Sequence, residues 1–232
     1  MNDICIIGNS HLAQVKLNYN AQNMSGIDFY GGGGFSSLYI KDNKLFSEDV
    51  KTKNNIRRTN GDEFIPLDKY KHFLIYGCEM PARTGWHWLK YYASASAKIY
   101  SENCLRQAYI DHLNVAYGFQ LAKMIKKSAI CENITIIPGP FPSETHPSVN
   151  DELLSCSSPA SAREILDKVE LISKNYLREY GINLLWNPRE LLSKNGFTTD
   201  IKYKAKREDD YLHMNPKGAK IVLSNILGYL AP

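Results

Sequence analysis

The sequence predicts a three-layer α/β/α sandwich built on a central, mainly parallel β-sheet. Short, continuous apolar segments alternate with longer segments in which apolar residues recur every three or four positions. Continuous apolar strands are typical of parallel sheets, because both faces of such a strand are buried. Alternation of strand with helix favours a sheet that is covered by helices on both faces. A chain of 232 residues suits one core, so we expect a single domain over 1–232.

The strands are predicted from apolar segments such as ICII, which follows Asp3, and ITII, which follows Asn133. The last helix has the clearest start, because Asn215 is a favourable N-cap and Pro216 suits the first helical position. The predicted strands are 4–7, 27–30, 72–76, 97–100, 134–137 and 182–186, and the predicted helices are 102–127, 161–180 and the segment after Asn215.

One segment, 35–68, departs from this alternation. Its sequence includes SSLYI and KDNKLF, which are typical of strand and turn. We therefore expect a hairpin excursion over one edge of the domain, placed so that it could shape substrate access.

The composition is that of an ordinary globular protein and excludes disordered, collagen-like and coiled-coil chains. Hydrophobic residues make up 44% and charged residues 22%, and 28 Lys and Arg against 24 Asp and Glu give a formal charge of +4. The basic clusters at 51–58 and 202–207 are not interleaved with stacking aromatic residues, so we expect solvated surface and no nucleic-acid partner.

The cysteines and the apolar segments indicate a reducing, membrane-free setting. The five cysteines show no CxxC spacing, and Cys5 and Cys131 suit buried thiols. No apolar stretch approaches the roughly 18 residues of a membrane span, and the N-terminus lacks the features of a signal peptide. We expect a cytoplasmic protein without a membrane partner. No histidine and carboxylate spacing suggests a metal site, and no cofactor is expected.

The first chemically suggestive segment is Gly8-Asn9-Ser10-His11, directly after the first predicted strand. Ligands of open parallel sheets bind at the carboxyl ends of the strands. Ser10 is therefore a candidate nucleophile, anion ligand or helix cap. The chain has no GxSxG elbow and no phosphate-binding GxxxxGK[ST] loop, which counts against an ordinary α/β-hydrolase and excludes a P-loop protein.

The second suggestive segment lies just before the last helix, where Asp210 precedes His213 by three residues. A nucleophilic serine needs a base within hydrogen-bond reach, and that base needs a partner that fixes its tautomer. Asp210 and His213 could supply both functions to Ser10. The alternative is an Asp and a His on the surface at a helix entry.

Together the two segments, GNSH and DYLH followed by MNPKGA, resemble the SGNH/GDSL hydrolases. The resemblance implies a flavodoxin-like sandwich with Ser10 as the nucleophile, His213 as the general base and Asp210 as its orienting carboxylate. Asp209 is a less favoured substitute, because the family spacing selects Asp210.

The same resemblance implies an oxyanion hole that includes a glycine of the second family block and an asparagine of the third. The favoured N–H donor is Gly33 or Gly34, in the run of glycines after the second strand. The alternative is that these glycines only form a flexible turn. The third block reads Gly77-Cys78-Glu79, with Glu79 in place of the family Asn, and it makes Gly77 and Glu79 candidate oxyanion or substrate-binding residues. An ionised Glu79 cannot donate to an oxyanion, and loss of one donor costs about 10²- to 10³-fold in rate. Arg83 could neutralise Glu79 or reach the site.

Other candidate residues each have a structural alternative. Cys78 could be a nucleophile but suits a packed thiol, and His146 could bind substrate at the edge of the cleft. His11 is expected to face either the mouth of the site or the surface of the helix. His87 lies between Trp86 and Trp88, which could form a sugar-stacking rim or a packing cluster.

The function expected from the resemblance is that of a serine hydrolase, which cleaves an ester through an acyl-enzyme on Ser10. The favoured reaction removes a small O-acyl group from a carbohydrate, within the wider expectation of a small-molecule or carbohydrate ester as substrate. An O-acyltransferase with the same three residues is one alternative. A catalytically silent glycan-binding or scaffold protein is another, and Glu79 is its main support. The oligomeric state stays open.

Overall fold

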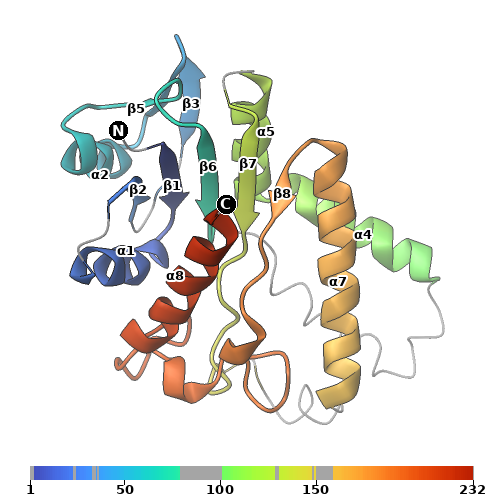
Figure 1. The fold of residues 1–232 in the computed structure, drawn as a ribbon. Coiled ribbons are helices and arrows are strands. Elements are labelled where there is room, and N and C mark those ends of the chain that lie inside the picture. Colours follow the sequence, from blue (N-terminus) through green and yellow to red (C-terminus); the bar gives the residue numbers. More distant parts are fainter. Residues whose placement is uncertain are drawn as a thin grey trace.

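The computed structural model describes residues 3–22, 25–32, 35, 37–78, 101–128, 131–147, 149 and 159–231 (Figure 1). Its main sheet has five strands in the order β2-β1-β6-β7-β8, and every pair of neighbours is parallel. The strands are β1 (Ile4–Gly8), β2 (Ile27–Gly31), β6 (His72–Tyr76), β7 (Asn133–Ile137) and β8 (Asn183–Leu184). The prediction of a central parallel sheet is confirmed.

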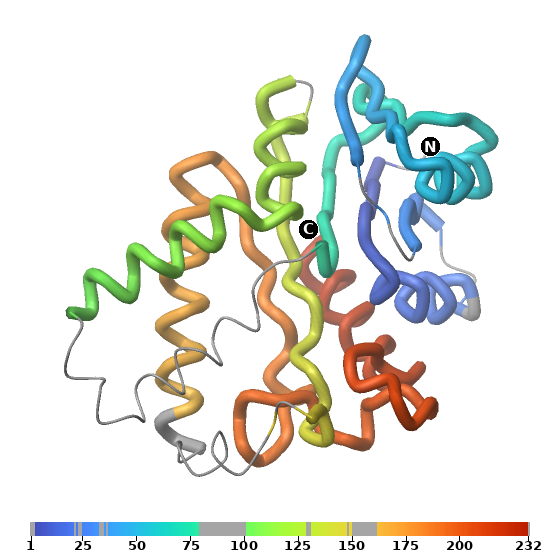
Figure 2. The backbone as a smooth tube through the Cα atoms, turned by 180° about the vertical axis from the view of Figure 1, so that it is seen from behind, coloured from blue at the N-terminus to red at the C-terminus, as the bar shows by residue number. Residues whose placement is uncertain are grey.

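Helices cover both faces of this sheet. Alternate residues of β1 point to opposite faces, so Ile6 packs in one apolar core and Cys5 and Ile7 pack in the other. The first core includes α1 (Leu12–Ala21) and α8 (Pro216–Leu230), and the second includes α4 (Glu102–Val115), α5 (Tyr117–Lys127) and α7 (Pro159–Glu179). The predicted three-layer sandwich is therefore confirmed, with α1 and α8, from opposite ends of the chain, side by side (Figure 2).

The segment 35–68 forms a small antiparallel sheet of β3 (Leu38–Lys41), β4 (Lys44–Ser47) and β5 (Ile65–Pro66). Asp42 and Asn43 link β3 to β4 with φ values of +50° and +60°, a conformation that Asp and Asn tolerate well in hairpin turns. Between β4 and β5 lies α2 (Val50–Asn60), a helix that the strand-and-turn prediction missed. Only Thr52 and Ile56 of α2 are buried, so its sequence carries almost no apolar periodicity.

The predicted helix 102–127 is instead two helices. Ala116 separates α4 from α5 with an extended backbone, φ −64° and ψ 126°. Neither Gly nor Pro occupies position 116, so no local signal marks the break. The start of α5 is tied to the end of β6, because the N–H of Gly118 donates to the carbonyl of Cys78 at 2.8 Å.

Smaller differences concern the ends of elements. The predicted strand 182–186 is paired only over Asn183–Leu184, at the edge of the sheet, and the predicted strand 97–100 lies outside the described residues. The short 3-10 helices η2 (Arg189–Leu191) and η3 (Ile201–Tyr203) were not predicted.

No helix within the described ranges is both long and apolar enough to cross a membrane.

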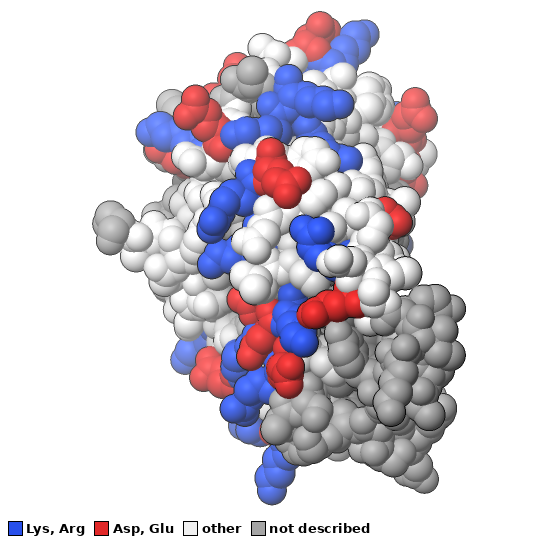
Figure 3. Space-filling view, turned by 90° about the vertical axis from the view of Figure 1, so that its right-hand side faces the viewer, with Lys and Arg blue, Asp and Glu red and all other residues white. Residues whose placement is uncertain are grey.

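Charges of both signs are interspersed on the surface. Figure 3 shows Lys and Arg mixed with Asp and Glu over one side of the molecule. The basic cluster at 202–207 includes two residues with acidic partners, since Lys202 pairs with Asp200 at 2.8 Å and Arg207 pairs with Asp209 at 2.6 Å. The expectation that the protein has no nucleic-acid partner stays a prediction.

The start of α8 follows the sequence expectation. The side chain of Asn215 accepts hydrogen bonds from the N–H groups of Lys217 (3.0 Å) and Gly218 (3.1 Å), and Pro216 is the first helical residue. We expect Asn215→Ala to lower the free energy of unfolding by about 1 kcal/mol, measured by urea denaturation. The exposed Ser224→Ala on the same helix is the matched control, and equal stability of the two variants would contradict the capping role.

Candidate active site

The candidate site lies where the strand order of the main sheet changes direction. From β1 the chain continues to β2 on one side, whereas β6, β7 and β8 follow in order on the other. In open α/β sheets of this order, ligands bind at the carboxyl ends of the strands beside such a switch point. Ser10 follows β1 closely and Gly77 follows β6 directly, so both lie at this edge.

The segment that carries His213 is brought to the same edge by backbone hydrogen bonds. The N–H of Ala205 donates to the carbonyl of His213 at 2.9 Å, and the N–H of Ser143 donates to the carbonyl of Tyr211 at 2.7 Å. These two bonds hold the segment that contains Tyr211 and His213 against Ser143, which follows β7, and against Ala205, which precedes the segment in the chain.

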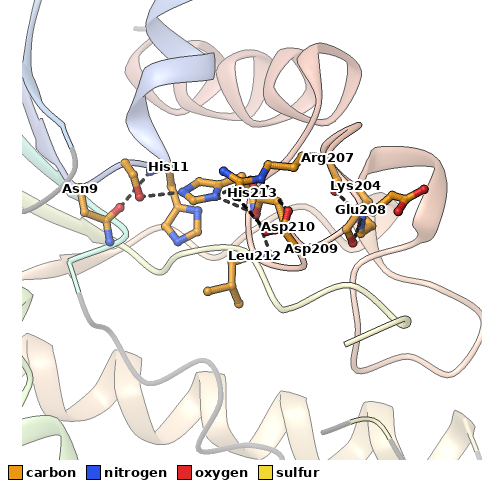
Figure 4. Close-up of polar contacts among 10 residues, drawn as sticks. Asn9, His11, Lys204, Arg207, Glu208, Asp209, Asp210, Leu212 and His213 are labelled. Atoms are coloured by element: carbon orange, nitrogen blue, oxygen red, sulfur yellow. Dashed lines mark hydrogen bonds and ion pairs between the residues drawn. The ribbon is translucent and has the colours of Figure 1, made fainter. Parts of the chain in front are cut away.

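Ser10, His213 and Asp210 form a continuous hydrogen-bonded chain. The His213 Nε2 atom lies 2.7 Å from the Ser10 Oγ atom, and His213 Nδ1 lies 2.8 and 2.9 Å from the two Asp210 carboxylate oxygens (Figure 4). With the Nδ1 proton donated to Asp210, Nε2 is left to accept the Ser10 hydroxyl proton. The structure therefore brings the three predicted residues together in the arrangement that an activated serine needs.

The helix-cap alternative for Ser10 does not hold. Helix α1 begins at Leu12, and no side chain caps its first turn. The Ser10 hydroxyl lies instead within hydrogen-bond distance of His213.

The environment of Asp210 favours its ionised form. Partial burial by itself raises the pKa of this carboxyl, but hydrogen bonds from the His213 N–H (3.0 Å), the His213 ring and the Leu212 N–H (3.3 Å) outweigh it. The pKa of Asp210 therefore lies below its ordinary value. An ionised Asp210 can hold the Nδ1 proton of His213 and stabilise the imidazolium that forms when His213 accepts a second proton.

Asp209 has a different partner. Its carboxylate accepts from Arg207 Nε at 2.6 Å and from Arg207 Nη2 at 2.8 Å. This ion pair is largely exposed, with 66% of the Asp209 side chain accessible to solvent. The structure thus places Asp210, and not its neighbour, on His213.

Only some of the residues expected to form the oxyanion hole are among the described residues. Gly33, Gly34, Glu79 and Arg83 lie outside the described residues, as does the segment with His87. Gly77 is described, but its N–H donates to the carbonyl of Ile137 at 2.9 Å and is already engaged between β6 and β7. The expectation that Gly77 contributes to the oxyanion hole therefore finds no support in its hydrogen bonding.

The start of the glycine run has a structural explanation. A Cβ atom on Gly31 would lie 2.3 Å from the carbonyl oxygen of Gly8, and one on Gly32 would lie 2.4 Å from the side chain of Asn55. These glycines are needed for the close approach of β2 to β1 and of the following turn to α2.

His11 lies closer to the site than either sequence interpretation suggested. Its ring packs against that of His213, with the ring centroids 4.9 Å apart and the planes tilted by 40°. Cys78, by contrast, is buried with its thiol directed to the carbonyl of Tyr76 at 3.6 Å, which suits the packed-thiol interpretation.

An open cavity of about 420 Å³ lies directly beside His213 and Asp210. His146 borders it, with its ring edge-to-face against that of Tyr211 and the two ring centroids 5.7 Å apart. The cavity is lined by His146, Arg207, Asp209, Asp210, Tyr211, Leu212 and His213. No group of three or more His, Cys, Asp or Glu side chains in the described part of the chain could hold a metal ion.

Comparison with known proteins gives low similarities. No family model and no curated protein sequence matches the chain. A GDSL-like lipase from Bacteroides thetaiotaomicron aligns over 99% of this chain and 87% of its own at 12% identity, with a TM-score of 0.45. The periplasmic domain of a lipopolysaccharide acetyltransferase from Salmonella Paratyphi A aligns over 99% and 83% at 15% identity, with a TM-score of 0.47. A lipase from a goat rumen metagenome aligns over 97% and 95% at 11% identity, with a TM-score of 0.46. These values are too low to assign an activity.

Proposed function

We propose that the protein is a serine hydrolase of the SGNH type that cleaves an ester through an acyl-enzyme on Ser10. The observation that carries the proposal is the hydrogen-bonded chain from Ser10 Oγ through His213 to Asp210. Its three members come from the two segments whose sequences resemble the family, GNSH and DYLH.

The first half-reaction forms the acyl-enzyme. Ser10 Oγ attacks the ester carbonyl carbon while its proton passes to His213 Nε2, and Asp210 balances the charge on the ring. Collapse of the tetrahedral intermediate breaks the bond to the alcohol oxygen, and His213 returns the proton to the departing alcohol.

The second half-reaction releases the acid. A water molecule attacks the acyl carbon and gives its proton to His213 Nε2, and this proton then passes to Ser10 Oγ as the acyl bond breaks. In both halves an oxyanion develops on the carbonyl oxygen and needs N–H donors. The backbone N–H of Ser10 and that of Gly33 or Gly34 are our proposed donors.

For the substrate we propose a carbohydrate or small-molecule ester with a small O-acyl group. The cavity beside His213 and Asp210 supports this choice, because the exposed Arg207–Asp209 pair and the ring of His146 offer hydrogen-bond donors and acceptors to hydroxyl groups. The same openness admits an acceptor alcohol in place of water, which is the O-acyltransferase alternative.

One experiment tests the reaction and separates these alternatives. The protein is incubated with p-nitrophenyl acetate and with an acetylated monosaccharide, each alone and with an excess of unmodified monosaccharide. We expect free acetate as the main product in all cases, quantified by chromatography. Acetate appearing chiefly on the added sugar would identify a transferase, and no turnover of either ester would favour the silent binding alternative.

A further inference from the structure

The ring of His11 fills a space between the ends of three neighbouring strands. His11 follows β1, whereas Gly77 and Gly139 follow β6 and β7. A Cβ atom on Gly77 would lie 3.2 Å from His11 Cδ2, and one on Gly139 would lie 3.6 Å from the same atom. A side chain at position 77 would therefore crowd the His11 ring, whereas one at position 139 would come into ordinary van der Waals contact with it.

Two asparagine side chains fix the walls of this space. The Asn9 side chain donates to the carbonyl of Gly77 and accepts from the N–H of His11 at 3.2 Å. On the other side, Asn187 Nδ2 donates to the carbonyls of Pro138 at 2.8 Å and Gly139 at 2.9 Å. Asn187 is only 8% exposed, so these bonds are shielded from water.

The His11 ring, which occupies this space, contacts the ring of His213, the proposed general base. The ring nitrogens of His213 are directed at Ser10 and Asp210, so His11 meets His213 ring against ring (Figure 4). Hydrogen bonds to Asp210 restrain the Nδ1 side of the His213 ring. The Nε2 side is restrained by the Ser10 hydroxyl, and the ring as a whole by the contact with His11.

We infer that His11 is a positioning residue that keeps His213 in place once Ser10 is acylated, an inference that rests on the proposed function. In the acyl-enzyme, Ser10 Oγ has lost its proton and can no longer donate to His213 Nε2. His213 must nevertheless keep its orientation, because it has to accept a proton from the attacking water. At that stage the contacts with Asp210 and His11 still restrain the ring.

The inference predicts an unequal effect on the two halves of the reaction. Without the His11 ring, His213 can swing away from the acyl carbon, and misplacement of a catalytic group by about 1 Å costs up to about 10²-fold in rate. We expect His11→Ala to slow deacylation by about 10- to 100-fold and acylation by much less. His11→Phe, which keeps a planar ring, is expected to retain most of the deacylation rate.

Stopped-flow measurement with p-nitrophenyl acetate separates these steps, since the burst reports acylation and the steady phase reports deacylation. The exposed His112→Ala on α4 is the matched control and should behave as the wild type. Melting temperatures show whether each variant is folded, and His11→Leu replaces His11→Ala if the latter unfolds.

Unchanged deacylation in His11→Ala would overturn the inference, as would an equal loss in both steps for the Ala and Phe variants. A wild-type protein with neither a burst nor labelling of Ser10 by a fluorophosphonate would overturn the proposed function, and the inference with it. Normal wild-type kinetics with unaffected His11 variants would overturn the inference alone.

Discussion

Ser10→Ala is expected to lower ester turnover by at least about 10³-fold, and by up to about 10⁶-fold if the three residues act as one unit. The reason is that Oγ is the atom that bonds to the acyl carbon, and no other group at this position can replace it. A fluorophosphonate probe should label the wild-type protein on the peptide that contains Ser10, as located by mass spectrometry.

Two further variants make this labelling experiment specific. Labelling should vanish in His213→Ala, because the hydroxyl 2.7 Å from Nε2 would lose the base that accepts its proton. It should persist in Ser224→Ala, which removes an exposed hydroxyl of α8 that takes no part in the hydrogen-bonded chain of Ser10, His213 and Asp210. Absence of labelling in a folded wild-type protein would instead support a silent binding protein, with Glu79 as the first residue to investigate.

Asp210→Asn is expected to lower kcat by about 10⁴-fold, the loss that accompanies the same change in a serine protease triad. An Asn side chain can present its amide N–H to His213 Nδ1, which stabilises the tautomer with the proton on Nε2. His213 would then donate to Ser10 instead of accepting from it. The loss should appear in kcat with little change in KM.

Asp209→Asn is the matched control for this prediction. Asp209 has the same side chain, adjoins Asp210 in sequence and pairs with Arg207 at the exposed rim of the cavity. Exposed ion pairs contribute at most about 1 kcal/mol to stability, so this variant should stay folded. With p-nitrophenyl acetate, which has no sugar hydroxyl groups for the Arg207–Asp209 pair to bind, it should keep nearly all of the wild-type kcat. Equal losses in the two variants would contradict the assignment of Asp210 as the partner of His213.

The elements predicted best from the sequence are those whose burial leaves a strong pattern. Strands β1, β6 and β7 lie inside the sheet and carry apolar residues on both faces, and α8 has both a cap at Asn215 and one continuous apolar face. Helix α2 was missed because it buries only Thr52 and Ile56. The break at Ala116 was missed because a contact with the end of β6 accompanies it and no local residue marks it.

The candidate site shows the same division between local and long-range information. Asp210 and His213 are three residues apart, so their contact can be expected from spacing alone. The packing of His11 involves Gly77 and Gly139, which follow strands far along the chain, and Gly77 leaves the closer space. No pattern around position 11 reveals that the ends of three strands leave space there.

The distance along the chain between Ser10 and His213 has a consequence for when reactivity arises during biosynthesis. The two residues are 203 positions apart, and their hydrogen bond requires the first strand and the last helix to reach their final places. A nascent or partly folded chain therefore carries Ser10 as an ordinary alcohol, without its base. Covalent capture by an active-site probe would consequently count only molecules that have finished folding, and would serve as a quality-control signal for the whole domain.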